Sequence, residues 1–154
     1  MRVSFVCLGN ICRSPMAAAV MAHRAAEAGV AVQVDSAGTA GWHVGEPADP
    51  RTAAELRRRG VPLTHAARQF AAGDFARFDL VLAMDADNAR NLRRLAPSPE
   101  DAAKVRLLRE FDPASRDGDR DVPDPYYGGD DGFRRVFDMV DAACLGLIRT
   151  LRSP

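Results

Sequence analysis

The N-terminal segment constrains the fold most, because an apolar run, a glycine-containing loop and an alanine-rich stretch follow one another closely there. Residues 2–6 (Arg-Val-Ser-Phe-Val) predict a β-strand, and Ser14-Pro15 predicts a helix start with serine as the N-cap. We expect this helix to continue to about Glu27, and a second strand to cover residues 30–34 and end near Ser36. The order strand, helix, strand predicts a parallel β-α-β unit.

The rest of the chain continues this alternation. Asp49-Pro50 and Asp85 each predict a helix start, and strands are expected at residues 79–84 and 104–108, of which the first is nearly continuously apolar. A closing amphipathic helix is expected because apolar residues recur at helical spacing, namely Phe133, Val136, Phe137, Val140, Cys144, Leu147, Ile148 and Leu151. The chain is therefore predicted to form one α/β domain over residues 1–154: an open four-stranded parallel twisted sheet with helices on both faces.

Composition limits the partners and the compartment. The chain has 154 residues, 47% of them hydrophobic, and its 21 basic residues equal its 21 acidic ones, so nothing draws it as a whole to nucleic acid or to a membrane surface. Residues 3–6 are too short for a signal-peptide core, and the three cysteines are an odd number. We therefore expect the native start to be the folded start of a cytoplasmic protein, a monomer or weak oligomer without membrane insertion.

The loop after the first strand carries the clearest chemistry. It consists of Cys7, Leu8, Gly9, Asn10, Ile11, Cys12, Arg13 and Ser14. A loop between a strand and a helix start presents free backbone N–H groups to an anion, and the helix dipole adds positive potential. Gly9 allows close approach of the backbone, Asn10 tolerates a left-handed conformation, and the Arg13 guanidinium matches two phosphate oxygens. The loop is predicted to bind phosphate.

The same donors would stabilise Cys7 as a thiolate, which could attack phosphorus to give a cysteinyl-phosphate that water then hydrolyses. This chemistry needs no metal ion or other cofactor. The leaving oxygen does need a proton from a carboxylic acid. Composition leaves the choice open within one aspartate-rich region, which contains Asp117, Asp119, Asp121, Asp124, Asp130 and Asp131.

The full loop motif, together with residues 122–127 (Val-Pro-Asp-Pro-Tyr-Tyr), resembles the low-molecular-weight protein tyrosine phosphatases. The similarity extends through essentially the whole chain and includes residues 35–39 (Asp-Ser-Ala-Gly-Thr), 65–69 (His-Ala-Ala-Arg-Gln) and 83–85 (Ala-Met-Asp). The resemblance implies a single low-molecular-weight phosphotyrosine phosphatase domain over residues 1–154. Its expected partners are proteins that contain phosphotyrosine.

The resemblance also implies a role for individual residues. Cys7 would be the nucleophile, Arg13 the phosphate clamp and Asp124 the general acid and then base. Ser14 would donate to the Cys7 thiolate, and Asn10, Ser36 and His65 would hold the loop in shape. Trp42, Tyr126 and Tyr127 would form the walls of the substrate pocket. Cys12 matches a position that can form a reversible, protective disulfide with Cys7.

Several other interpretations compete with this one. A zinc site at Cys7 and Cys12 is disfavoured because the chain has no Cys-x-x-Cys pair and no spaced histidine pair. A thiol-linked arsenate reductase would need further cysteines, and residues 80–96 contain none. A phosphoarginine phosphatase is a closer rival, although such loops tend to carry threonine where Ile11 stands. A phosphotyrosine-binding module would be expected to lack Cys7 or Asp124, and both are present.

One departure from the family pattern lies in the first helix. Many relatives carry glutamate where this chain has Ala18, and we expect the change to affect stability or local electrostatics rather than chemistry. Cys144 falls on the apolar stripe of the closing helix, so we expect it to be a buried structural residue.

Overall fold

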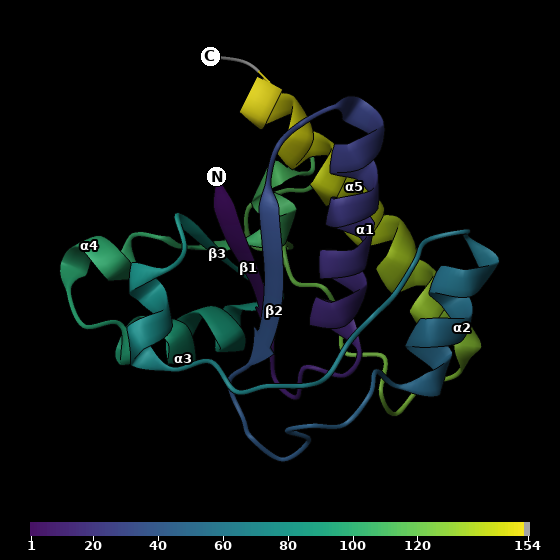
Figure 1. Ribbon diagram of the computed structural model, residues 1–154, viewed down its shortest axis with the longest axis horizontal. Helices are drawn as coiled ribbons and strands as arrows, with labels where there is room; N and C mark the ends of the chain where they lie inside the picture. The colour runs from purple at the N-terminus through teal and green to yellow at the C-terminus, as the bar shows by residue number, and fades with distance from the viewer. Residues whose placement is uncertain (153–154) are drawn as a thin grey trace.

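The computed structural model describes residues 1–152, and its architecture is a four-stranded parallel sheet between two layers of helices (Figure 1). The elements in chain order are β1 Arg2–Cys7, α1 Arg13–Ala28, β2 Gln33–Gly38, α2 Pro50–Arg58, η1 Ala72–Ala76, β3 Leu80–Ala83, α3 Ala86–Leu95, α4 Pro99–Ala102, β4 Val105–Leu107, η2 Leu108–Phe111 and α5 Asp130–Arg152. The strand order is β2-β1-β3-β4, and every pair is parallel. The predicted fold class is confirmed.

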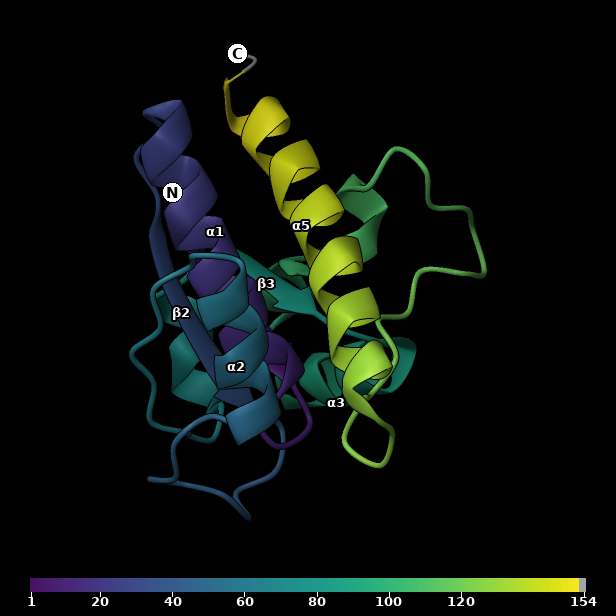
Figure 2. The ribbon, with the colours of Figure 1, turned by 90° about the vertical axis from the view of Figure 1, so that its right-hand side faces the viewer.

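Each face of the sheet is covered by its own core. Helices α1, α2 and α5 lie on one side, and α3 with α4 lies on the other (Figures 1 and 2). Alternate residues of β1 separate the two cores: Phe5 packs with α1 and α5, whereas Val6 packs with α3 and the aromatic residues of the segment before β3. The predicted apolar stripe of α5 is buried from Phe133 to Ile148, and Leu151 is half-buried.

Two helix starts follow the predicted capping chemistry. The Asp49 carboxylate accepts from the backbone N–H of Arg51 at 2.8 Å, and the Asp85 carboxylate accepts from that of Asn88 at 2.8 Å. The other predicted cap is wrong, because α1 begins at Arg13 with Cys12 as its N-cap residue and no side-chain cap. Ser14 lies inside the helix, where its hydroxyl turns toward Cys7 instead.

The second strand also begins later than predicted, at Gln33 rather than at residue 30. After α1 the left-handed Gly29 reverses the chain, and the N–H of Val30 bonds back to the Ala25 carbonyl, which closes the helix end. Pairing with β1 starts only where Gln33 meets Arg2, and it continues to the pair Cys7 and Gly38. This register places Gly38, at the end of β2, beside Cys7, where the loop after β1 begins.

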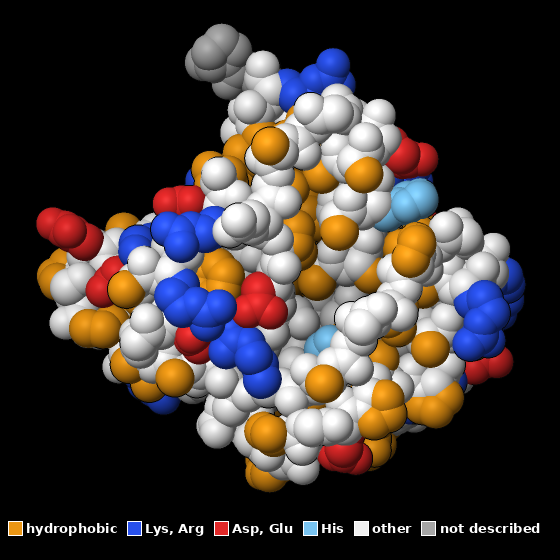
Figure 3. Space-filling model, in the orientation of Figure 1, with side chains coloured by type: hydrophobic (Ala, Val, Ile, Leu, Met, Phe, Trp, Pro, Cys, Tyr) orange, Lys and Arg blue, Asp and Glu red, His pale blue; other side chains and the backbone are white. Residues whose placement is uncertain are grey.

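Charges of both signs intermingle on the surface, and no single sign covers the face in Figure 3. This distribution agrees with the equal numbers of acidic and basic residues. Within residues 1–152, no helix has the length and apolar character needed to cross a lipid bilayer.

Candidate active site

The loop from β1 to α1 forms a cradle at the carboxyl edge of the sheet, with Cys7 at its base. Cys7 is only 2% exposed, and its Sγ accepts a hydrogen bond from the backbone N–H of Asn10 at 3.3 Å. The Ser14 Oγ lies 3.0 Å from the same sulfur. Asn10 has φ of 60°, the left-handed conformation predicted for it, and is the only non-glycine residue with positive φ among residues 1–152. The sulfur thus faces donors from two sides.

A buried polar network holds Asn10 in this conformation. Its Nδ2 donates to the hydroxyls of Ser14 at 2.8 Å and Ser36 at 3.0 Å, and its Oδ1 accepts from the backbone N–H of Arg68 at 2.9 Å. The Nε2 of His65 donates to the Asn10 carbonyl at 2.6 Å, since a carbonyl oxygen can only accept. The structure therefore brings together Asn10, Ser36 and His65, for which a shared supporting role was expected, and adds Ser14 to them.

Burial lowers the pKa of His65 below its usual value, although the hydrogen bond to the Asn10 carbonyl opposes this effect. His65 is accordingly neutral near pH 7, and its remaining proton sits on Nε2. His65 lines a hollow of about 310 Å³ whose wall also includes Ala18.

Arg13 closes the cradle on the side of β3. Its side chain is 3% exposed, and Nη1 donates to the Asp85 carboxylate at 2.6 Å and to the Val122 carbonyl at 2.9 Å. Burial alone would lower the pKa of Arg13, but the charges of Cys7 and Asp85 outweigh it and raise the pKa above its ordinary value. Arg13 is therefore a fixed cation. Its Nη2 lies 3.7 Å from Asp124 Oδ2, too far for a hydrogen bond.

A cavity of about 170 Å³ lies above the cradle, and all the residues predicted for its walls line it. Its lining consists of Cys7, Leu8, Gly9, Ile11, Cys12, Arg13, Trp42, His43, Asp124, Tyr126 and Tyr127. Trp42 is 72% exposed, so it belongs to the rim and not to the core. Tyr126 and Tyr127 pack edge to face with ring centroids 4.9 Å apart. Asp124 is the one member of the aspartate-rich region in this lining.

A close backbone contact fixes the cradle to β2. A Cβ on Gly38 would lie 2.7 Å from the Leu8 carbonyl oxygen and 3.1 Å from the Asn10 nitrogen, so only glycine fits there. Two further bonds tie the same segments, from the Thr39 N–H to the Cys7 carbonyl and from the Ala40 N–H to the Leu8 carbonyl, each at 2.9 Å. Gly38 was part of a recognised motif, but this steric requirement was not predicted.

A family model for low molecular weight phosphotyrosine protein phosphatase matches residues 2–154 of this chain. The chain belongs to this family. A low molecular weight protein-tyrosine-phosphatase of Streptomyces coelicolor is 61% identical over 154 residues, which cover 99% of this chain and 94% of the relative. The chain is thus a phosphatase of a hydrolase family, as its sequence predicted.

Solved structures agree with the fold of this phosphatase. A protein tyrosine phosphatase from Entamoeba histolytica matches with a TM-score of 0.93 and 39% identity, covering 98% of this chain and 96% of that one. A Drosophila arginine phosphatase matches with a TM-score of 0.92 and 33% identity, covering 99% of each chain. The shared fold therefore spans enzymes named for two different phosphorylated residues.

Two residues of this phosphatase site had no signal in the sequence. Arg51, at the start of α2, donates to the carbonyls of Tyr126 at 2.8 Å and Gly128 at 3.0 Å, and so holds the loop that carries Asp124. His43 lines the cavity and pairs through Nδ1 with Glu46 at 2.7 Å. The Arg51 contacts join residues 75 and 77 positions apart, which no local pattern connects, whereas His43 and Glu46 are only three positions apart.

The other two cysteines of the phosphatase differ from Cys7 in their surroundings. Burial, with the charges of Asp49 and Asp124 adding to it, raises the pKa of Cys12 to about 12. Burial likewise raises the pKa of Cys144, which packs between α5 and α1 as expected. All three cysteines are free thiols, and residues 1–152 contain no cluster of three or more potential metal ligands among His, Cys, Asp and Glu.

Proposed function

We propose that this protein hydrolyses phosphotyrosine in proteins, with Cys7 as the nucleophile. The observation that carries the proposal is the position of the Cys7 sulfur, which accepts a hydrogen bond from the Asn10 N–H and lies 3.0 Å from the Ser14 hydroxyl. A thiolate carries no proton, so in that form the Ser14 hydroxyl is the donor to the sulfur, which is nearer to it than the Ala37 carbonyl at 3.4 Å. Two such donors favour the thiolate, which is the form that attacks phosphorus.

Arg13 is proposed to bind the equatorial phosphoryl oxygens together with the loop amides. Its Nη1 is occupied by Asp85 and Val122, so the guanidinium is oriented before any substrate arrives. A preoriented cation of this kind stabilises the transition state without a cost of reorganisation. The attack and the later hydrolysis of the cysteinyl-phosphate both proceed without a metal ion.

Asp124 is proposed as the general acid for the leaving phenol and then as the base for water. Its Oδ1 accepts from the Tyr126 N–H at 3.1 Å, which leaves Oδ2 on the side of Arg13 and the cavity. Asp121, another candidate from the same region, is instead engaged with the Ala86 N–H at 2.9 Å. Asp124 thus lies at the mouth of the cavity, where the leaving oxygen would emerge and need a proton.

The aromatic rim supports phosphotyrosine as the substrate. Trp42, Tyr126 and Tyr127 offer stacking surfaces for a phenyl ring, and Ile11 offers an apolar one. A phosphoarginine substrate is the second candidate, because a Drosophila arginine phosphatase shares the fold at 33% identity. The apolar Ile11 and the relative at 61% identity, which is named a protein-tyrosine-phosphatase, favour phosphotyrosine.

The experiment that tests the proposal compares rates on one peptide carrying phosphotyrosine, phosphoserine or phosphoarginine. We expect turnover of the phosphotyrosine peptide, inhibition by vanadate, no requirement for added metal, and loss of turnover in Cys7→Ser. A higher kcat/KM on phosphoarginine would replace the substrate assignment. Turnover retained in Cys7→Ser would refute the cysteinyl-phosphate mechanism.

We further propose that the protein acts in the cytoplasm, where its three free thiols stay reduced. Cys12 lines the same cavity as Cys7, so oxidation could join the two sulfurs reversibly and protect the nucleophile. Mass spectrometry after peroxide treatment and after thiol reduction tests this redox role. A Cys7 sulfinic acid formed as readily in the wild type as in Cys12→Ser would contradict it.

A further inference from the structure

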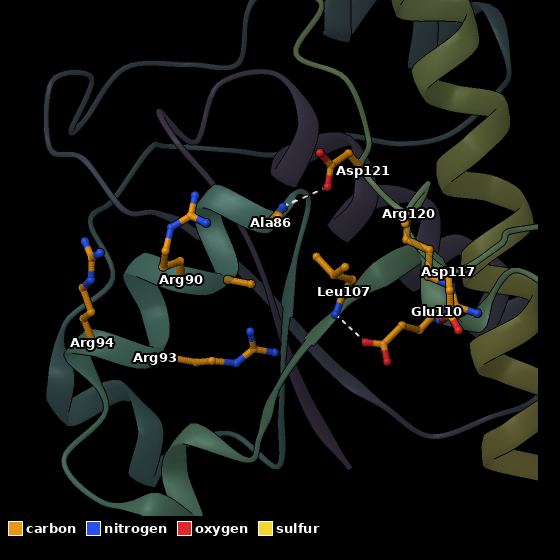
Figure 4. Close-up of a pocket in the computed structure, with 11 residues that line it drawn as sticks. Ala86, Arg90, Arg93, Arg94, Leu107, Glu110, Asp117, Arg120 and Asp121 are labelled. Atoms are coloured by element: carbon orange, nitrogen blue, oxygen red, sulfur yellow. Dashed lines mark hydrogen bonds and ion pairs between the residues drawn. The ribbon is translucent and has the colours of Figure 1, made fainter.

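A second and larger hollow lies away from Cys7, between α3 and the segment of residues 107–121 (Figure 4). Its volume is about 730 Å³, which is within the range of ligand and peptide clefts. We call it the α3 cleft; its lining consists of Ala86, Ala89, Arg90, Arg93, Arg94, Leu107, Glu110, Asp117, Gly118, Arg120 and Asp121. No residue of the proposed reaction belongs to it.

The acidic residues of the α3 cleft are already engaged within the protein. Glu110 accepts from the backbone N–H of Leu107 at 2.7 Å, and Asp121 accepts from that of Ala86 at 2.9 Å, as the dashed lines in Figure 4 mark. Asp117 pairs with Arg120 at 2.7 Å. None of these carboxylates is left without a hydrogen-bond donor.

The arginines of the cleft carry the charge that remains. Arg90 pairs with Asp87, but among residues 1–152 Arg93 makes only one hydrogen bond, from Nη2 to the Val105 carbonyl at 3.2 Å. Arg94 makes no hydrogen bond or ion pair with any part of the chain that the structure describes, and both Arg93 and Arg94 are exposed. Figure 4 shows Arg93 reaching from α3 toward Leu107. Arg93 and Arg94 therefore carry positive charges that no carboxylate within residues 1–152 pairs with.

A further hollow lies between the α3 cleft and the active-site mouth, and Arg90 lines both this hollow and the cleft. Its volume is about 400 Å³, and it is lined by Leu8, Arg13 and Asp124 of the site, and by residues of the first turns of α3. A chain bound at the mouth can thus continue along α3 past this hollow toward the cleft.

The length of this path suits a short stretch of peptide. Asp85, which contacts Arg13, and Arg94 are separated by about 13 Å along the helix axis at 1.5 Å per residue. An extended peptide covers that distance in about four residues. An acidic side chain about three to five residues from a phosphotyrosine would therefore reach Arg93 and Arg94.

We infer that the α3 cleft binds an acidic residue of the substrate protein and selects substrates with a carboxylate on one flank of the phosphotyrosine. The inference rests on the proposed phosphotyrosine activity and adds a substrate class to it. Arg93 and Arg94 contact only this flank, so they contribute to peptide recognition and not to the chemical step.

The test measures kcat/KM on three phosphotyrosine peptides that differ only in the flank, which carries glutamates, alanines or lysines. We expect the wild type to prefer the glutamate peptide over the alanine peptide by about fivefold, as for partly exposed ion pairs, and less at high salt. Arg94→Glu, which removes no intramolecular contact, should abolish this preference, and the double variant Arg93→Glu/Arg94→Glu should favour the lysine peptide.

The matched control is Arg57→Glu, the same change on α2 at the opposite side of the molecule (Figure 1). It should keep the wild-type preference, and all variants should hydrolyse a small aryl phosphate at the wild-type rate. Equal kcat/KM on the three peptides, or a preference unchanged in Arg94→Glu, would overturn the inference while the proposed function stands. Failure to hydrolyse even the small aryl phosphate would refute the proposed function and the flank recognition with it.

Discussion

Arg51 donates from Nη2 to the carbonyl oxygen of Tyr126 at 2.8 Å, and its guanidinium carbon lies 5.7 Å from the centre of the Tyr126 ring. The same guanidinium binds the Asp49 carboxylate, whose pKa is lowered because Arg51 outweighs the effect of burial. The backbone N–H of Asp49 in turn donates to the Ile11 carbonyl at 2.8 Å. The start of α2 therefore connects the phosphate loop to the loop that carries Asp124.

This connection predicts that Arg51→Ala impairs catalysis, although the Arg51 side chain acts through the loop that carries Asp124 and not on the substrate. Hydrogen bonds to a charged group are worth about 1.5–3 kcal/mol each, so without the Arg51 guanidinium the loop that carries Asp124 should lose its fixed position. We expect kcat to fall about tenfold for poor leaving groups, while the affinity for vanadate changes little. Steady-state rates on aryl phosphates of graded leaving-group pKa check this, with Arg57→Ala on the same helix as the control. Equal losses in kcat and vanadate affinity would indicate general damage instead.

Removing the proposed acid should give a different pattern. In Asp124→Ala the leaving phenolate receives no proton, so hydrolysis should slow most for phenols of high pKa and least for good leaving groups. The slope of log kcat against leaving-group pKa measures this and should become steeper than in the wild type. Asp121→Ala is the control, since its carboxylate is held by the Ala86 N–H. An equal loss for all leaving groups would remove Asp124 from the acid role.

Gly38→Ala should damage the phosphate loop although it adds one methyl group. The new Cβ would lie 2.7 Å from the Leu8 carbonyl oxygen, so the loop must move away from β2. Overpacking of this kind costs about 1–3 kcal/mol of unfolding free energy. We expect that loss in urea unfolding, together with at least tenfold weaker vanadate binding. Gly73→Ala is the control, because a Cβ there meets no atom within 4 Å. Wild-type vanadate binding in Gly38→Ala would contradict the steric argument.

The sheet was predictable from sequence because its signals are local. The apolar run that became β3, the aspartate caps of α2 and α3, and the stripe of α5 each lie within one element. The start of β2 was not predictable in this way, because the alternating Val30 and Val32 suggest that the strand begins earlier than it does. Only the pairing of Gln33 with Arg2 decides where the ladder begins, and that depends on the whole sheet.

The candidate site divides in the same way. The loop motif names Cys7 and Arg13 directly, whereas the aspartate-rich region gave six candidates until a family resemblance singled out Asp124. The ion pair of Arg13 with Asp85 and the clamp of Arg51 on Tyr126 each join segments more than 70 positions apart. Such contacts follow from tertiary packing, so no periodicity or capping pattern in the sequence predicts them.

The two cysteines of the phosphate loop should differ in reactivity. The pKa of Cys12, raised to about 12, leaves almost no thiolate at pH 7.5, whereas Cys7 is the proposed nucleophile and its sulfur accepts from the Asn10 N–H beside the Ser14 hydroxyl. Iodoacetate should therefore alkylate Cys7 first, and bound vanadate should protect it. Peptide mass spectrometry of the wild type and of Cys12→Ser measures the rates. Faster labelling of Cys12 in the wild type would contradict the thiolate assignment.

Ala18→Glu should change how stability depends on pH through His65. The folded-state pKa of His65 lies below its ordinary value, so the unfolded chain binds a proton more readily and stability is lost as pH falls below about 6.5. Ala18 and His65 line the same hollow, and a carboxylate there should raise the pKa of His65. The loss of unfolding free energy between pH 7.5 and 5.5 should then shrink or reverse.

Two measurements separate this effect from a general one. NMR titration of the His65 ring should show its pKa rising in Ala18→Glu but not in Ala26→Glu, which places the same charge further along α1 on an exposed position. Urea unfolding at both pH values should follow the titration in direction. Because protonated His65 still donates from Nε2 to the Asn10 carbonyl, the phosphate loop should keep its shape and vanadate its affinity. A raised pKa accompanied by weaker vanadate binding would mean that the charge of His65, and not only its hydrogen bond, acts on the loop.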